Sequence, residues 1–391
     1  MYFQTLDDKK ECVGVYAEGA LHFDKFPTGL ARTWKYTGSV TDEKIEYGWL
    51  YADGESLEQA CPDHLSDRLR TAQKRFRAYL KTFQIGKINL REHCFFDLVP
   101  ESFLMEFCEV KNEITQHIFE TRERPLNYNL LDDFQKLIHK IRYQNLNLNK
   151  EGCRQLYHSS RGRRKANELM KNHYFIDYSL FGTVTGRLTT RSKSFPILTL
   201  KKEFRRLIKP HNDWLISLDY NGAEVRTLLH LSGIEQPDED IHQWNAQHIF
   251  DKDIDRDTAK TLFFTWLYNP DSDAIKTDYY DRKKVLDRWY EGGYIYTPYK
   301  RKIKVDERKA LNYLIQSTTS DRVLSRAVEI DKFLEGKKSF ISHIVHDEVV
   351  IDFCDDEREM ILDIKQIFER DDFNANIRGG KNYLELAELQ L

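Results

Sequence analysis

Two short apolar runs that lead into carboxylates constrain this chain more than any other feature. The run at residues 214–218 is followed directly by Asp219, and the run at residues 340–345 is followed two residues later by Asp347. Apolar runs of this length predict buried strands. Another apolar run begins at residue 349, so Asp347 is expected in the turn of a β-hairpin. The sequence therefore predicts a sheet with acidic side chains at the ends of its strands.

A helical face with cationic and aromatic side chains is predicted between the two acidic runs. A helix is expected near residues 257–267, and side chains spaced four residues apart would share one side of it. The side chains with this spacing are Arg256, Lys260, Phe264 and Tyr268. The cations can follow a chain of phosphates, and the aromatic rings can lie beside a base.

Each of these patterns also has an ordinary structural explanation. Asp219 can be a solvated strand end, and Glu224 can be an acidic residue that stabilises the start of a helix expected at residues 223–231. An acidic hairpin turn and a mixed helix face are likewise common in proteins without an active site. Together, however, two carboxylates can hold a pair of Mg²⁺ ions, which in-line phosphoryl transfer requires.

Composition limits the class of protein but does not identify it. The 391 residues suffice for two or three domains, and 40% of them are hydrophobic. No apolar run reaches 18 residues, and the N-terminus has no basic segment followed by an apolar one, so secretion and membrane insertion are not expected. The six cysteines are scattered without a C-x-x-C pair, which indicates reduced thiols and a cytoplasmic location.

The formal net charge of −3 hides a strong segregation of charge. Residues 160–210 contain thirteen Lys or Arg and three Asp or Glu, a net of +10, whereas residues 1–66 have a net of −6. A local basic field matters more for binding nucleic acid than the total charge. Nucleic acid therefore stays open as a partner.

The rest of the chain predicts further elements. Residues 1–60 suggest a small β-containing region, and residues 64–82 a basic amphipathic helix. Apolar residues recur at helical spacing in two later stretches, which fit an elongated antiparallel helix pair with Pro125 in the connection. A basic tip at residues 161–165 follows, either a solvated loop or a contact for phosphates. Residues 355–370 predict a closing helix.

Two further motifs, together with the blocks above, resemble the family A DNA polymerases. Thr183-Val184-Thr185-Gly186-Arg187-Leu188 is similar to the T-x-T-G-R-L segment of that family, and Glu307-Arg308-Lys309-Ala310-Leu311-Asn312 is similar to a later one. The block around Asp219 continues the resemblance as far as Asp240-Ile241-His242. The resemblance is strong over roughly half the chain and loose over the region of residues 101–175, and residues 1–100 match no known family.

The resemblance implies a role for each candidate residue. For the catalytic and metal site it implies Asp219, Asp347, the Tyr220 carbonyl, Lys260 and, in support, Glu348. For the dNTP it implies Arg256, Lys260, His242, Phe264, Tyr268 and, as a steric gate against the ribose 2′-hydroxyl, Glu224. For the primer–template it implies Arg187, Arg308, Asn312, Gln316, His346 and the basic tip with Arg163, Arg164 and Lys165. Arg187 and Gln316 can donate to minor-groove acceptors that every correct base pair presents.

The implied fold class is α+β, a right-hand polymerase with an antiparallel-sheet palm, a helical thumb, short helical fingers and a small N-terminal domain. The expected boundaries are 1–100 for the N-terminal domain, 101–175 for the thumb, 176–232 and 301–391 for the palm, and 233–300 for the fingers. Two departures from the family stand out. Asn269 occupies a position where the family usually has Gly, and Phe195-Pro196-Ile197-Leu198 replaces a template-contacting segment.

The implied activity is template-directed extension of a primer with dNTPs, with two Mg²⁺ ions for which Mn²⁺ can substitute. Primer–template DNA and dNTPs are the expected partners, with a separate exonuclease or a processivity factor as a further candidate. The D-x-E that precedes the polymerase-like region, Asp53-Gly54-Glu55, has a turn-like context, so no intrinsic proofreading is expected. The compact arrangement suggests a phage enzyme in a bacterial host cytoplasm.

Two rival interpretations stay open. A single-subunit RNA polymerase must admit the 2′-hydroxyl, and Glu224 and Phe264 argue against that class. A catalytically inactive relative that only binds DNA is the other, and the joint presence of Asp219, Asp347 and Lys260 argues against it.

Overall fold

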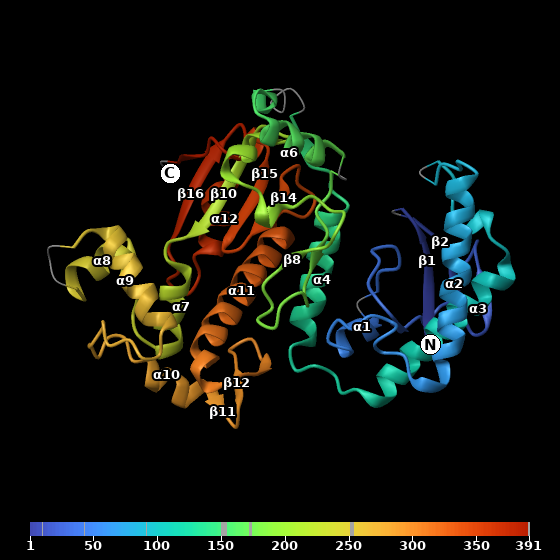
Figure 1. Ribbon diagram of the computed structural model, residues 1–391, viewed down its shortest axis with the longest axis horizontal. Coiled ribbons are helices and arrows are strands. Elements are labelled where there is room, and N and C mark those ends of the chain that lie inside the picture. Colours follow the sequence, from blue (N-terminus) through green and yellow to red (C-terminus); the bar gives the residue numbers. More distant parts are fainter. Residues whose placement is uncertain are drawn as a thin grey trace. The chain divides into compact units, whose positions relative to one another are not determined.

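The computed structural model describes residues 1–9, 11–42, 44–90, 92–149, 155–171, 174–250 and 254–389. The chain forms two compact units, Met1–Lys140 and Ile141–Leu391, and each is described by itself (Figure 1). The first unit is longer than the predicted N-terminal domain of residues 1–100, and its boundary falls within the stretch predicted as the thumb. The thumb assignment therefore stays a prediction.

The first unit is built on a small sheet, as the sequence predicts. β1 (Phe3–Asp8), β2 (Glu11–Ala17) and β3 (Ala20–His22) are antiparallel neighbours. On the other side of β1, a parallel bridge from Tyr2 reaches Arg32 of β4 (Arg32–Thr33), which pairs in parallel with β5 (Glu46–Tyr47). β1–β3 thus form one sheet, β4 and β5 form a second, two-stranded sheet, and the Tyr2–Arg32 bridge links them.

Helices complete this unit, and their apolar stripes form its core. They are α1 (Gly48–Tyr51), α2 (Asp63–Ile85), the 3₁₀ turn η1 (Phe96–Leu98), α3 (Glu101–Thr121) and α4 (Tyr128–Arg142), of which α4 reaches into the second unit. The predicted helical spacing is confirmed, because Phe103, Ile114 and Ile118 of α3 are all buried. The predicted pairing is wrong, because α3 packs against α2, β1 and β2 and has no comparable contact with α4.

The second unit contains a five-stranded antiparallel sheet in the order β14-β15-β10-β16-β17. The strands are β10 (Trp214–Tyr220), β14 (Phe340–Val345), β15 (Glu348–Phe353), β16 (Ala375–Gly380) and β17 (Ala387–Glu388). β10 is the central strand, and Asp219 lies opposite Glu348 on one side and Asn376 on the other. Both predicted apolar runs are strands, and the turn between β14 and β15 holds His346 and Asp347.

Helices and a second sheet surround this central sheet. The helices are α7 (Ala223–Ser232), α8 (Ile241–His248), α9 (Arg256–Tyr268), α10 (Arg282–Trp289), α11 (Glu307–Phe333) and α12 (Met360–Phe368). The second sheet has β11 (Tyr290–Glu291), β12 (Tyr294–Tyr296) and β13 (Lys302–Lys304). α12 is shorter than the helix predicted at 355–370, because residues Asp355–Glu357 form the 3₁₀ turn η5 instead.

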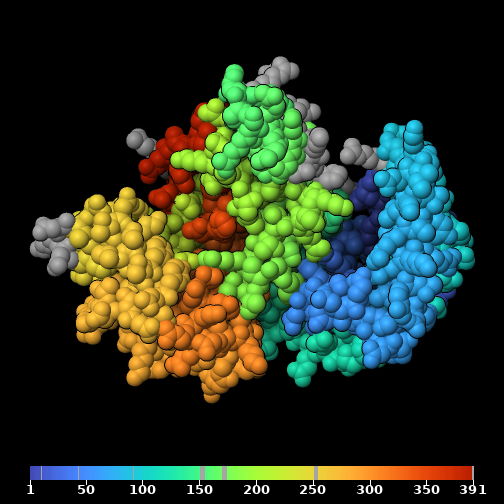
Figure 2. All heavy atoms as spheres, in the orientation of Figure 1, coloured from blue at the N-terminus to red at the C-terminus, as the bar shows by residue number. Residues whose placement is uncertain are grey.

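The segment between α4 and β10 has little regular structure except for one helix. It contains the strand pairs β6 (Asn147–Leu148) with β9 (Ile208–Lys209) and β7 (Tyr178–Ser179) with β8 (Thr189–Thr190), and the 3₁₀ turns η2 (Gln155–His158), η3 (Ile197–Thr199) and η4 (Lys202–Leu207). The basic tip lies in α6 (Ser160–Lys171) and is therefore helical rather than a loop. Figure 2 shows α6, in green, at the surface. No helix in the described ranges is long and apolar enough to cross a membrane.

Candidate active site

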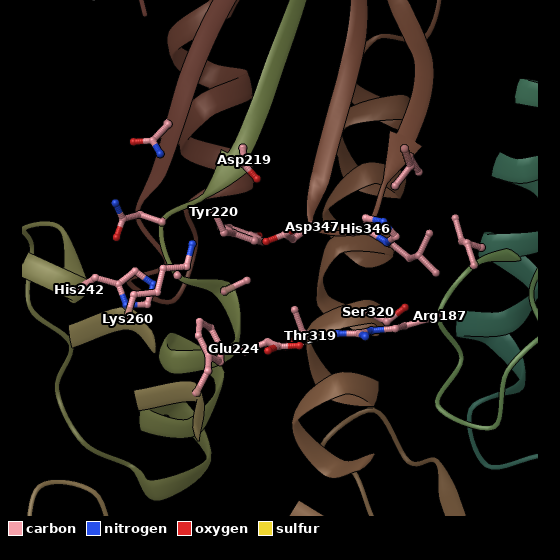
Figure 3. Close-up of a pocket in the computed structure, with 18 of the residues that line it drawn as sticks. Arg187, Asp219, Tyr220, Glu224, His242, Lys260, Thr319, Ser320, His346 and Asp347 are labelled. Carbon is pink, nitrogen blue, oxygen red and sulfur yellow. Dashed lines mark hydrogen bonds and ion pairs between the residues drawn. The ribbon is translucent and has the colours of Figure 1, made fainter. Parts of the chain in front are cut away.

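A cavity of about 350 Å³ in the second unit brings most of the predicted site together (Figure 3). Its walls come from the end of β10, the β14–β15 turn, and the helices α7, α8, α9 and α11. The predicted residues that line it are Arg187, Asp219, Tyr220, Glu224, His242, Arg256, Lys260, Phe264, His346 and Asp347. Segments that are more than 150 residues apart in the sequence thus contribute to one pocket.

Two carboxylates dominate the electrostatics of this pocket. Burial, together with the nearby charges of Asp347 and Glu348, raises the pKa of Asp219 to about 7. Burial, followed by Glu224, also raises the pKa of Asp347. Arg378 on β16 donates one hydrogen bond to Asp219 at 3.2 Å, which offsets only part of this repulsion. The pocket therefore concentrates negative charge that a cation can neutralise.

Glu348 supports the site from behind and does not line the cavity. Its carboxylate is 7% exposed and accepts hydrogen bonds from the hydroxyls of Ser217 at 2.5 Å and Tyr383 at 2.6 Å. The neighbouring His346 takes a positive φ of 56°, which allows the tight turn that presents Asp347. Glu348 thus contacts the β10 strand and Tyr383 rather than the cavity, and its supporting role in catalysis stays a prediction.

Glu224 closes one side of the pocket through two partners. Arg187 donates to one carboxylate oxygen at 2.5 Å, and the Tyr268 hydroxyl donates to the other. Burial and the Glu224 charge raise the pKa of that hydroxyl, so it stays protonated. The Tyr268 ring stacks on Phe264, with centroids 5.9 Å apart. Glu224 is thus held rigidly where the first turn of α7 meets α9.

Three of the four residues of the predicted α9 face line the cavity, and Tyr268 does not. The three are Arg256, Lys260 and Phe264. Lys260 is exposed and makes no ion pair within the described part of the chain, so its ammonium group is available to an anion. Arg256, in contrast, is already paired with a carboxylate.

That carboxylate belongs to Asp240, whose side chain accepts hydrogen bonds from α8, from α9 and from the turn after β10. Its Oδ1 accepts from the backbone amides of His242 (3.0 Å) and Gln243 (2.9 Å) and from Arg256 Nε (3.0 Å). Its Oδ2 accepts from Arg256 Nη2 (2.7 Å) and Asn221 Nδ2 (2.8 Å). Asp240 therefore caps α8, orients the first residue of α9 and fixes the turn that follows β10.

His242 faces the pocket as a neutral side chain. It is 2% exposed, and burial followed by the charge of Lys260 lowers its pKa to about 4. Its Nδ1 atom is buried without a hydrogen-bond partner in the described part of the chain. A buried polar atom of this kind favours a ligand that supplies the missing partner.

The remaining predicted contacts lie outside the cavity. Arg308, Asn312 and Gln316 follow one another along α11, and Arg308 is exposed and paired with Asp271 at 2.7 Å. Arg163 and Arg164 are exposed on α6. Lys165, also on α6, is paired with Glu168 at 2.7 Å. Gln316 reaches the edge of the pocket through a side-chain hydrogen bond with the Tyr268 hydroxyl, whereas Arg308 and the α6 residues do not line the cavity. The DNA contacts of these residues stay predictions.

The segment with Arg187 is docked on α11 through a glycine. Gly186 has a φ of +76°, and a Cβ there would lie 2.7 Å from the guanidinium carbon of Arg301. Ser320 Oγ donates to the Gly186 carbonyl at 3.1 Å, and Arg301 forms a two-pronged pair with the buried Asp321 at 2.6 and 2.8 Å. These contacts explain why Arg187 reaches the pocket from a segment without regular structure.

Sequence reasoning gave no role to several residues that build the pocket. They are Asn221, Asp240, Thr319, Ser320, Asn376 and Arg378. A signal existed for Asp240, because an Asp directly before a predicted helix is a common N-cap. No local signal marks Arg378, which reaches Asp219 only because β16 pairs with β10.

The donor set at the base of the pocket fits divalent metal ions. Asp219, Asp347 and the Tyr220 carbonyl supply hard oxygen donors of the kind that Mg²⁺ prefers. The described residues contain no cluster of three or more His, Cys, Asp or Glu side chains with metal-site geometry. A metal held here would therefore need oxygens from its substrate as further ligands, which is common for Mg²⁺.

Comparison with known proteins agrees with this geometry. No protein-family model matches the chain. DNA polymerase I of Chloroflexus aurantiacus is 25% identical over 275 residues, which cover 55% of this chain and 29% of the relative. Thermostable DNA polymerase I of Thermus thermophilus is 27% identical over 240 residues (48% and 29%). DNA polymerase I of Lactococcus lactis is 26% identical over 243 residues (48% and 28%). The chain thus spans less than a third of the length of these relatives.

A solved structure matches over a larger share of the fold. The polymerase domain of Pol1 from M. smegmatis, in complex with DNA primer-template and dNTP, has a TM-score of 0.55 at 13% identity. The match covers 72% of this chain and 76% of that domain. The fold is therefore that of an α+β right-hand polymerase with an antiparallel-sheet palm, as predicted. Over its polymerase-like region the chain is similar in sequence to DNA polymerase I proteins, which belong to family A.

Proposed function

We propose that the chain is a template-directed DNA polymerase that extends a primer with dNTPs and uses two Mg²⁺ ions, for which Mn²⁺ can substitute. One observation carries this proposal. Asp219 and Asp347, more than 120 residues apart, face the cationic side of α9 across a single cavity. The relation to family A polymerases supports the reaction, and the cavity supports the residues that perform it.

Asp219, Asp347 and the Tyr220 carbonyl would hold the metal ions. Bound there, divalent cations would polarise the reacting phosphate and reduce the charge cost at the attacking and leaving oxygens. The two aspartates are partly buried, so their charges attract cations more strongly than exposed carboxylates would. Glu348 keeps the turn in place through its two hydroxyl partners.

The opposite wall suits the triphosphate of a dNTP. Lys260 makes no ion pair in the described ranges, so its ammonium group can bind phosphate. Arg256 is oriented by Asp240, and its Nη1 atom makes only a long contact of 3.4 Å with the exposed Asp257. His242 can donate one hydrogen bond as a neutral imidazole. Phe264 provides an apolar surface for the sugar, and Tyr268 continues this surface toward the base.

Glu224 would exclude a ribose 2′-hydroxyl. Two donors hold its side chain, so it cannot swing away at low cost to admit the extra oxygen atom. This argues for DNA rather than RNA synthesis. Arg187, whose guanidinium lies beside Glu224, would reach the primer–template minor groove together with Gln316, with Arg308, Asn312, His346 and the basic residues of α6 as further contacts.

We also propose that these 391 residues provide no proofreading. Asp53 and Gly54 have positive φ values of 48° and 79°, so the D-x-E of the first unit lies in a turn rather than on a buried strand. The thumb, palm and fingers boundaries, a phage source, a cytoplasmic location and a separate exonuclease or processivity partner stay predictions.

The test is primer extension with Mg²⁺ on purified protein, comparing wild type with Asp219→Asn and Asp347→Asn. Each change keeps the side-chain size but removes a metal-binding charge, so extension should fall by roughly 1,000-fold, which corresponds to about 4 kcal/mol of transition-state stabilisation. Asp356→Asn is the matched control, because Asp356 is exposed and pairs only with Lys338 at the surface. A mismatched primer should not shorten without dNTPs.

Two results would contradict the proposal. A folded wild type that binds primer–template without extending it would identify the chain as a binding relative. Full activity of both aspartate variants would place the metal site elsewhere.

A further inference from the structure

The solvent-exposed face of the small β11–β13 sheet carries tyrosine and lysine side chains that lie outside the pocket. Tyr294 lies opposite Lys304, and Tyr296 opposite Lys302, so all four side chains share one face. The intervening pair, Ile295 and Ile303, is buried on the other face. The sheet thus anchors in the core through isoleucines and presents tyrosines and lysines to solvent.

The rings and cations of this face are close together and accessible. The Tyr296 ring is 41% exposed, and Lys302 and Lys304 are both exposed. Lys302 Nζ lies 4.5 Å from the ring centre of Tyr294 and 5.7 Å from that of Tyr296. Lys300 adds a cation at the β12–β13 turn, whereas Glu291 is the single acidic side chain in register with them. The face is therefore positively charged around an aromatic centre.

The position of this sheet relates it to the pocket. α11 begins at Glu307, three residues after β13 ends, and its Thr319 lines the cavity. Twelve residues of helix correspond to about 18 Å. The predicted DNA contacts Arg308, Asn312 and Gln316 lie along this path. In Figure 1, β11 and β12 lie beside the lower end of α11.

We propose that this face binds the single-stranded template ahead of the pocket, with bases on Tyr294 and Tyr296 and phosphates on Lys302 and Lys304. Aromatic rings beside mobile cations are the common means of binding single strands without sequence preference. The inference rests on the proposed function, because only a template-directed enzyme needs such a path. The distance of about 18 Å corresponds to roughly five nucleotides at a rise of about 3.4 Å each.

An ordinary alternative is that the lysine–tyrosine contacts only stabilise the hairpin. The two explanations differ in what they predict for DNA binding. A stabilising contact affects every DNA substrate equally or not at all. A template surface affects only substrates whose single strand is long enough to reach it.

The test measures fluorescence anisotropy of a labelled primer–template duplex with a 5′ template overhang of either 2 or 12 nucleotides, without dNTPs. Wild type should bind the long overhang at least tenfold more tightly. Tyr296→Ala and, separately, Lys302→Ala should each reduce affinity for the long overhang about tenfold and leave the short overhang unchanged. Lys302→Ala should also lower the salt dependence of long-overhang binding by about one unit of slope.

Controls separate a local effect from loss of structure. Tyr296→Phe keeps the ring and should bind as wild type does, and Lys337→Ala removes an exposed lysine elsewhere and should change nothing. Equal effects on both substrates, or none, would overturn the inference. A wild type that prefers the long overhang but does not extend the primer would support this surface and contradict the proposed activity.

Discussion

Glu224 illustrates how one residue can be predicted correctly in position yet incompletely in its interactions. The sequence places it in the first turn of α7, and the resemblance implies a steric role. The structure adds that Arg187 and Tyr268 both donate to its carboxylate. Its rigidity therefore comes from residues 37 positions earlier and 44 positions later, which no local pattern links to it.

Replacing Glu224 tests whether its size or its charge excludes ribonucleotides. Glu224→Ala opens space beside the sugar and should raise ribonucleotide incorporation relative to deoxyribonucleotide incorporation on the order of 10–100-fold. Glu224→Gln keeps the volume and should retain most of the selectivity, although it weakens the ion pair with Arg187. The measurement is the ratio of kcat/KM for one ribonucleotide and its deoxy counterpart. Unchanged selectivity in Glu224→Ala would remove the steric-gate assignment.

Most of the residues that line the pocket could be predicted from the sequence, because their residue type and their spacing along the chain indicate their role. Asp219, Asp347 and the face of α9 follow from strand ends and a four-residue repeat. The direction in which the Glu348 side chain points could not be predicted. It depends on hydrogen bonds from the hydroxyls of Ser217 and Tyr383, which are far from Glu348 in the sequence. Sequence spacing defines which residues are candidates, and tertiary contacts define which of them face the pocket.

Among the elements, α8 and α9 depend on a single carboxylate. Asp240 caps one helix and holds the first residue of the other, and it also binds Asn221 beside the metal-binding strand. We expect Asp240 to position Arg256 for the proposed triphosphate contact, because few rotamers of Arg256 keep both hydrogen bonds of this pair.

Two substitutions separate these roles of Asp240. Asp240→Ala should lower the free energy of unfolding by about 1–2 kcal/mol through loss of the cap and raise the KM for dNTP about tenfold. Asp240→Asn can still cap α8 through its oxygen, so stability should recover while the KM stays raised. Steady-state kinetics and thermal unfolding give the two readouts. A KM equal to that of wild type in both variants would show that Arg256 is oriented by other contacts.

Helices and strands were predicted well where the apolar residues recur with a clear period. They were predicted poorly where contacts between distant segments determine their length or their neighbours. β10, β14, β15, α7 and α9 lie where the sequence predicts them. The predicted packing partner of α3 was wrong. The apolar residues of a helix show which of its sides is buried, but they do not show which neighbouring element covers that side. α12 is shorter than predicted because residues 355–357 form a 3₁₀ turn with side-chain contacts to Arg358 and Lys338.

At the scale of the whole molecule, the two units have separate hydrophobic cores. One contains Phe103 together with Leu6, Tyr16 and Phe83, and the other contains Phe263 with residues of α7 and α11. Separate cores favour separate unfolding transitions.

Calorimetry can test this separation with a matched pair of core substitutions. Phe103 and Phe263 are both fully buried. Phe103→Ala should destabilise only the transition of the first unit, by about 3–5 kcal/mol, and Phe263→Ala should destabilise only the other one by a similar amount. If either change moves a single common transition, the units unfold as one cooperative body.

The central position of β10 has a consequence for how such a chain can vary. Each edge of this strand is paired over six residues, with β15 on one side and β16 on the other. A slip of one residue would exchange Asp219 for Leu218 at the pocket and turn every alternate side chain to the opposite face. Loops, helices and the length of the α9–α11 segment can therefore change during evolution. An insertion or deletion inside these three strands would instead disrupt the site, even if both aspartates were retained.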